Sequence, residues 1–254
     1  MSDVVAYSGK FRITKNDIAY AHHRHDYERD FIGVGEPIDR QMVFSTITYS
    51  MLSAAQNTPR LIKVYDKIRR RKMNIPENIK KSSDGDIEAL LKGTRFPKVK
   101  MERFKKLPEW WEKKESQDVV DYVVEKINSN DVSKQKCMRH MLSVNGPLGV
   151  SHKTSSLIVQ TLTKDLKDVD VVTVDKWILD VLKRMGHTIN GRNIKVPDYR
   201  TVPGITKKEY IECERIISED AERFGLSPGE LGYTLWCNLA YIKRDKGLFE
   251  HLNY

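Results

Sequence analysis

Apolar residues recur at helical spacing along most of this chain, which predicts a protein built almost entirely of helices. In the stretch 59–71, Leu61, Ile62, Tyr65 and Ile68 share one face and a proline stands in the first turn, as in an amphipathic helix. Residues 42–55 are largely apolar and predict a buried helix. The same criteria predict helices over 84–93, 97–107, 118–127, 134–144, 154–166, 175–185, 205–224 and 228–243.

Strand patterns are scarce. Residues 168–174 alternate only briefly, and residues 186–196 contain an Asn-Gly turn that indicates a small hairpin. There is no internal repeat and no low-complexity tract. The fold class predicted from the pattern is therefore all-α.

The chain has 254 residues, of which 39% are hydrophobic, enough for one large or two small domains and too many for a disordered chain. The N-terminal residues contain no apolar segment typical of a signal peptide, and no stretch of the chain is apolar over the length of a membrane span. The three cysteines, Cys137, Cys213 and Cys237, lie far apart, which argues against a disulfide framework or a cysteine-bound metal cluster. We expect no membrane association and a reducing compartment, the cytoplasm or nucleoid.

Lysine and arginine number 44 against 35 acidic residues, a net charge of +9. Such an excess favours a polyanionic partner, nucleic acid first, although a protein can be basic without one. Residues 67–72 and the lysines and arginines of 97–107 are candidates for phosphate binding or simply for solvated faces. His22, His23 and His25 suggest a metal, but no neighbouring constellation completes a site.

The chemically informative stretch runs from 143 to 186. A helix ends, a tight turn follows over Pro147, Leu148, Gly149, Val150 and Ser151, and a second helix starts near His152. Such a hairpin leaves backbone N–H groups free to bind a DNA phosphate irrespective of base sequence. Lys153 lies in the first turn, where the positive end of the helix dipole favours a neutral, nucleophilic amine. Asp175 follows 22 residues later, after an apolar run, where it can cap a helix.

These residues resemble the helix-hairpin-helix DNA glycosylases with the Gly-Pro-Asp signature, which include endonuclease III and the 8-oxoguanine glycosylases. The matching segments are 149–155 (GVSHKTS), 174–177 (VDKW) and 183–186 (KRMG). Upstream, 52–58 (LSAAQNT) and 93–107 match two further family segments in the same order. The resemblance covers roughly residues 42 to 186.

The resemblance implies a two-lobed helical glycosylase. One lobe would be a helical barrel over 58–165 that ends in the hairpin, and the other would combine 1–57 with 166–254, with the active-site cleft between them. By resemblance, Lys153 attacks the anomeric carbon of the sugar and Asp175 assists. Residues that the resemblance assigns to DNA contact are Gln56, which fills the gap left by the flipped base, with Asn57, and Gly149, Val150, Ser151, His152, Arg95 and Lys98.

Four departures from the family pattern stand out. Ser151 replaces the second hairpin glycine, and Lys176-Trp177 replaces Thr-His after the aspartate. The spacing between Lys153 and Asp175 exceeds the usual one, which predicts a longer loop before Val171. The cysteine cluster of endonuclease III is absent.

The function that the resemblance implies is base excision repair by a bifunctional DNA glycosylase and abasic-site lyase that works through a lysine Schiff base. Its leading substrate is 8-oxoguanine; an oxidised pyrimidine is mildly disfavoured by the missing cluster. Alternatives are a glycosylase for bulky modified bases of foreign (phage) DNA and a non-catalytic DNA-binding module. We expect double-stranded DNA with a flipped base as partner, a monomer, and no cofactor beyond a structural monovalent cation that the hairpin could hold.

Overall fold

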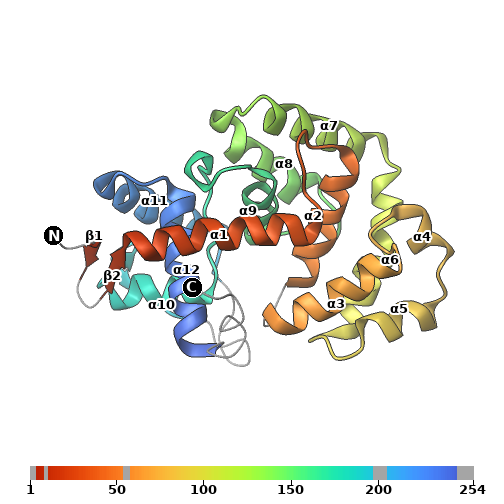
Figure 1. The fold of residues 1–254 in the computed structure, drawn as a ribbon, viewed down its shortest axis with the longest axis horizontal. Helices are drawn as coiled ribbons and strands as arrows, with labels where there is room; N and C mark the ends of the chain where they lie inside the picture. The colour runs from red at the N-terminus through yellow and green to blue at the C-terminus, as the bar shows by residue number, and fades with distance from the viewer. Residues whose placement is uncertain (1–3, 9–10, 54–57, 197–204, 245–254) are drawn as a thin grey trace. The chain divides into compact units, whose positions relative to one another are not determined.

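The computed structural model describes residues 4–8, 11–53, 58–196 and 205–244 (Figure 1). It is mostly helical, as the apolar pattern predicts. None of the described helices is long and apolar enough to cross a membrane. The elements, in chain order, are β1 Val4–Ser8, β2 Phe11–Thr14, α1 Lys15–Ile32, α2 Arg40–Ser53, α3 Thr58–Arg70, α4 Pro76–Lys81, α5 Asp84–Leu91, α6 Pro97–Trp111, α7 Lys114–Asn128, η1 Val132–Lys134, α8 Gln135–Asn145, α9 His152–Leu162, η2 Leu166–Asp168, α10 Lys176–Arg184, β3 Thr188–Ile189, β4 Arg192–Asn193, α11 Lys207–Phe224 and α12 Pro228–Arg244.

All ten predicted helices are present, with their ends shifted by a few residues. The small hairpin is also confirmed: β3 pairs with β4, and Asn190 and Gly191 both adopt the left-handed backbone conformation that a two-residue hairpin turn requires. Residues 169–174 do not form a strand. The helices α1 and α4 and the antiparallel pair β1–β2 were not expected from the sequence.

The chain divides into two compact units, one of residues 28–162 and the other of residues 1–27 with 163–254. The resemblance implies that all of 1–57 belongs with the C-terminal part, whereas residues 28–53 form one compact unit with the helices that follow them. The physical reason is α2, which is buried from Val43 to Leu52 and packs on α9, α7 and α3. A helix buried on all its faces has to lie inside a core, here that of the unit of residues 28–162.

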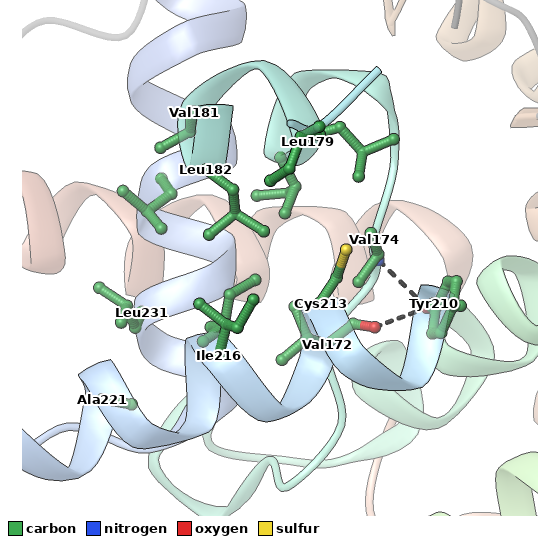
Figure 2. Packing of buried hydrophobic residues seen from close by; sticks show 14 of the residues in the cluster. Val172, Val174, Leu179, Val181, Leu182, Tyr210, Cys213, Ile216, Ala221 and Leu231 are labelled. Carbon is green, nitrogen blue, oxygen red and sulfur yellow. Dashed lines mark hydrogen bonds between the residues drawn. The ribbon is translucent and has the colours of Figure 1, made fainter. Parts of the chain in front are cut away.

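The unit of residues 1–27 and 163–254 has its core among α10, α11 and α12 (Figure 2). Apolar side chains from all three helices are buried there, Leu182, Ile217 and Leu231 among them. Helix α11 is fixed at both ends, by a capping box between Thr206 and Glu209 and by Gly225 in the left-handed region. The packed helices α11 and α12 therefore support α10, at whose start the candidate residue Asp175 lies.

Candidate functional site

The predicted hairpin is present between α8 and α9. The Val150 N–H donates to the carbonyl of Pro147 over 3.1 Å, which closes the turn. Gly149 has φ +95°, a backbone conformation that side chains with a β-carbon rarely adopt. The turn therefore requires glycine at position 149 for a local reason, whatever it binds.

Ser151, the departure from the family glycine, is the N-cap of α9. Its carbonyl accepts the first helical hydrogen bond, from the Ser155 N–H at 2.8 Å, and its hydroxyl lies 3.4 Å from that of Thr154. Serine is among the preferred N-cap residues, whereas replacing it by glycine costs only a few tenths of a kcal/mol. Ser151 therefore serves as a helix cap at this position of the hairpin.

Lys153 lies in the first turn of α9 and is half-buried. Within the described part of the chain, its amine forms no ion pair and no side-chain hydrogen bond. The N–H groups of a first helical turn have no partner inside the helix and give that end a partial positive charge. An amine in this place is available both to a phosphate-bound substrate and for nucleophilic attack.

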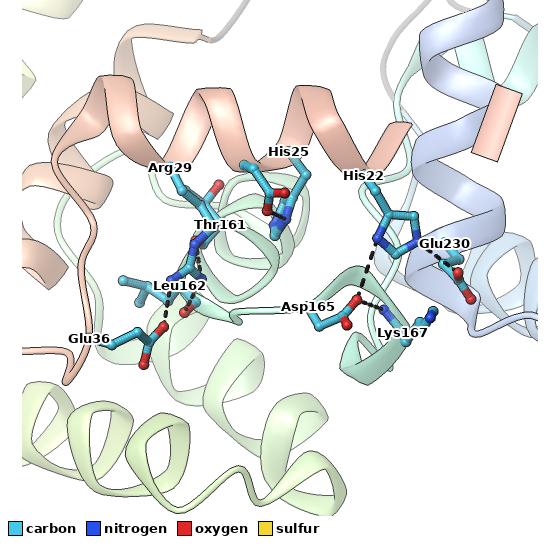
Figure 3. A network of polar contacts seen from close by, with 10 residues as sticks. His22, His25, Arg29, Glu36, Thr161, Leu162, Asp165, Lys167 and Glu230 are labelled. Carbon is cyan, nitrogen blue, oxygen red and sulfur yellow. Dashed lines mark hydrogen bonds and ion pairs between the residues drawn. The ribbon is translucent and has the colours of Figure 1, made fainter. Parts of the chain in front are cut away.

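Buried side chains hold the helix-hairpin-helix segment at two points, the far end of α9 and the end of α8 next to the hairpin. At the far end of α9, Arg29 donates to the carbonyls of Thr161 and Leu162 over 3.3 and 2.9 Å and pairs with Glu36 at 2.6 Å (Figure 3). At the end of α8, the indole N–H of Trp110 donates to the carbonyl of Asn145 over 2.7 Å. These contacts satisfy helix-terminal carbonyls and fix the position of the hairpin between the two helices.

Asp175 is the N-cap of α10, as the sequence predicts. Its Oδ1 accepts hydrogen bonds from the N–H groups of Trp177 and Ile178, at 2.8 and 3.1 Å. No residue in the described ranges donates a hydrogen bond to its Oδ2. Since the side chain is only partly buried, one carboxylate oxygen orients the group and the other can face a substrate.

The segment that leads to Asp175 is held by α11 and α12. The Tyr210 hydroxyl donates to the carbonyl of Val172 over 2.6 Å and accepts from the N–H of Val174 at 3.1 Å (Figure 2). Glu214 accepts from the N–H of Val172 at 3.1 Å, and the Gly229 N–H donates to the carbonyl of Val169 over 2.9 Å. The connection before Asp175 is therefore anchored by these hydrogen bonds, and no periodicity in the sequence indicates them.

Two residues predicted to contact DNA lie near the start of α6, and one lysine of this helix that was expected at the surface is buried. Arg95 and Lys98, near its start, are exposed, as DNA binding requires. Lys100, which the sequence treats as a surface cation, is 5% exposed and donates to the carbonyl of Leu52 over 2.8 Å. Lys100 therefore cannot reach a phosphate; it fixes the end of α2 immediately before residues 54–57.

Phe96, the N-cap of α6, is a candidate functional residue that the sequence does not indicate. Its side chain is 60% exposed, and its backbone has φ 55°, ψ 51°, in the left-handed region. A bulky residue in that region is strained, and strain of this kind concentrates at functional sites. The signal available in the sequence was an aromatic residue just before a proline in a basic segment, which is weak by itself.

The remaining predicted residues fall in different parts of the chain. Lys153 and the hairpin belong to the unit of residues 28–162, and Asp175 belongs to the other unit. Gln56 and Asn57 lie outside the described residues. His22 lies between two carboxylates, 2.8 Å from Glu230 and 3.4 Å from Asp165 (Figure 3). Among the described residues, no group of three potential ligands could hold a metal ion.

Neither a protein-family model nor a curated protein sequence matches this chain. Solved structures do. An 8-oxoguanine DNA glycosylase of Thermotoga maritima is 19% identical with a TM-score of 0.59, over 91% of this chain and 96% of that one. One from Methanocaldococcus jannaschii is 17% identical with a TM-score of 0.56, over 85% and 86%. The same enzyme's complex with a 15-mer DNA containing 8-oxoguanine aligns over 90% of both chains, with 18% identity and a TM-score of 0.56. The chain therefore has the helical fold of the 8-oxoguanine DNA glycosylases.

Proposed function

We propose that this protein is a DNA glycosylase with abasic-site lyase activity, which excises a damaged base through a Schiff base on Lys153. The observation that carries the proposal is the position of Lys153, half-buried and without an ion pair in the described part of the chain, in the first turn after the hairpin. The fold shared with 8-oxoguanine glycosylases, one of them solved with lesion-containing DNA, supports the same function.

The hairpin would bind one phosphate of a duplex through backbone N–H groups, which carries no sequence information. Because a stacked base is out of reach of any side chain, the damaged nucleotide must rotate out of the helix. A flipped nucleotide brings its anomeric carbon, C1′, toward the amine of Lys153. Gln56 would occupy the space that the base leaves.

The reaction begins with attack of the Lys153 amine on C1′. The glycosidic C–N bond breaks, and the base leaves with the electron pair and takes up a proton. The carboxylate of Asp175 would stabilise the positive charge that develops on the sugar and relay the proton that the attacking amine loses. Its fixed Oδ1 and available Oδ2 suit this role.

The bond between C1′ and the ring oxygen then opens to give an iminium ion between Lys153 and C1′. Loss of a proton from C2′ expels the 3′-phosphate, so that the strand is cut by β-elimination. Water then hydrolyses the imine and releases the lysine. Both activities therefore follow from one covalent intermediate.

Among substrates, we propose 8-oxoguanine first, because the enzymes with solved structures of this fold are described as 8-oxoguanine DNA glycosylases. The test is to incubate the protein and sodium borohydride with each of a series of duplexes. Each duplex carries one candidate lesion: 8-oxoguanine, an oxidised pyrimidine or a bulky modified base. Borohydride reduces the imine to a stable amine, so the duplex that yields a protein–DNA adduct identifies the substrate. Duplex binding without an adduct on any lesion would favour the non-catalytic module.

A further inference from the structure

Arg103 of α6 lies against the hairpin. A β-carbon built on Gly149 would stand 2.6 Å from both Cδ and Nε of Arg103 and 2.8 Å from its Cζ. Such distances are well below van der Waals contact, so the guanidinium end of Arg103 lies directly over the glycine, and a side chain at 149 would push it aside. Its positive φ is what requires glycine at 149, and the close contact shows where the end of Arg103 lies.

Arg103 has no acidic partner among the described residues, nor have Arg95 and Lys98 near the start of the helix. The neighbouring carboxylate, Glu102, pairs instead with Lys106 at 2.9 Å. Lys105, two residues on and facing α5, pairs with Asp84 at 2.6 Å. Lys105 and Lys106 are therefore neutralised, whereas Arg103, beside the hairpin, has no carboxylate partner in the described part of the chain.

The positive charges near Arg103 repel one another. The pKa of Lys100 is lowered to about 8, chiefly by burial and in addition by the positive charges of Arg103 and Arg95. This requires the three cations to lie close together. An anion placed among them would relieve the repulsion, because a guanidinium presents a planar fork that fits two oxygens of a phosphate.

We propose that Arg103 is a DNA-binding residue whose guanidinium holds the same backbone phosphate as the hairpin. The N–H groups of the hairpin and the first turn of α9 would contact the phosphate from one side, and Arg103 from the other. Lys100 lies one turn earlier on α6 and donates to Leu52, so it keeps this part of the helix in place beneath the site. The inference rests on the proposed DNA binding. It adds Arg103 to the phosphate-binding groups, which otherwise come from the hairpin and from the first turn of α9.

The test measures duplex affinity at several salt concentrations for three variants. Arg103→Met keeps the length of the side chain but removes the charge, Arg103→Lys keeps the charge, and Lys105→Met removes an exposed, paired charge from the same helix. For duplex DNA, each phosphate contact contributes about 0.9 to the slope of log affinity against log salt. We expect Arg103→Met to lower the slope by about 0.9 on lesion and undamaged duplexes alike, with Arg103→Lys and Lys105→Met close to the unmodified protein.

An unchanged slope in Arg103→Met, with or without a lower melting temperature, would show that Arg103 only packs against the hairpin. An equal drop in Lys105→Met would show that any cation of α6 contributes, and would also overturn the assignment. Borohydride trapping separates this result from the proposed function. A wild-type protein that binds duplexes but forms no adduct refutes the glycosylase while the slope still decides the role of Arg103, and a protein that binds no duplex refutes both.

Discussion

The ammonium group of Lys100, buried in α6, donates a 2.8 Å hydrogen bond to the backbone carbonyl of Leu52 at the end of α2. A lysine without a carboxylate in such a place has a lowered pKa, here about 8 against an ordinary 10.5, chiefly because burial disfavours its charge. The contact joins a segment close to the hairpin to the segment that precedes Gln56. It also links the stability of the protein to pH.

Between pH 8 and 10.5 the unfolded chain holds the Lys100 proton more tightly than the folded protein does. Stability therefore rises with pH in that window, by up to about 1.4 kcal/mol per pH unit for a single proton. Lys100→Met removes this linkage. In urea unfolding at pH 7, 8, 9 and 10, the free energy of unfolding of the unmodified protein should rise relative to that of the variant above pH 8. Parallel pH profiles would mean that Lys100 has an ordinary pKa.

Replacement of Asp175 separates capping from chemistry. Asparagine is as good an N-cap as aspartate, so Asp175→Asn should melt within a few degrees of the unmodified protein while base excision falls by about 10² or more. Asp175→Ala should lose the cap as well, at a cost of about 1 kcal/mol. Asp165→Asn is the matched control, because Asp165 caps η2 in the same connection, and it should keep its activity. Full excision by folded Asp175→Asn would reduce Asp175 to a helix cap.

Gly149→Val should weaken binding of lesion and undamaged duplexes by similar factors. A β-branched residue is strained at φ +95°, and its β-carbon would displace Arg103. Because phosphate contact carries no sequence information, discrimination for the lesion should survive. Ser151→Gly should be tolerated, since glycine replaces an N-cap serine at little cost. Affinities at two salt concentrations check this; a Gly149→Val protein that lost discrimination but kept its non-specific affinity would show that the hairpin does not hold phosphate.

Phe96 should matter for duplex substrates more than for stability. Glycine adopts φ 55° without strain, so Phe96→Gly should keep or raise the melting temperature. An exposed aromatic ring can enter a base step and help unstack it, which a single strand does not need. Excision should therefore fall on a lesion duplex and change little on a single-stranded lesion oligonucleotide. Equal losses on both substrates would argue against a role in opening the duplex.

Local patterns predicted the elements with the clearest periodicity. The helix expected over 59–71 spans Thr58–Arg70, and the Asn-Gly turn lies where predicted. Helix α1 escaped prediction because it is rich in charged residues and histidines, and its contacts are long-range: Arg29 donates to carbonyls more than 130 residues away. Apolar periodicity indicates a buried helix only where the buried face is made of apolar residues.

In the candidate site, too, features set by the local sequence could be predicted, whereas features set by long-range contacts could not. Gly149 and the cap by Asp175 follow from turn and helix-end chemistry, which acts over a few residues. The burial of Lys100 and the position of Arg103 over Gly149 depend on helices distant in sequence. The strained backbone of Phe96 could not be expected, because the residue before a proline normally avoids helical conformations.

The most direct test of the proposed chemistry is borohydride trapping on an 8-oxoguanine duplex, with the adduct digested and mapped by mass spectrometry. The unmodified protein and Lys164→Gln, an exposed lysine just beyond the other end of α9, should both form the adduct, and the modified peptide should contain Lys153. Lys153→Gln should form none while it keeps duplex affinity within about tenfold, because phosphate contacts dominate binding. An adduct that persists in Lys153→Gln, or that maps to another lysine, would contradict the assignment of Lys153 as the nucleophile.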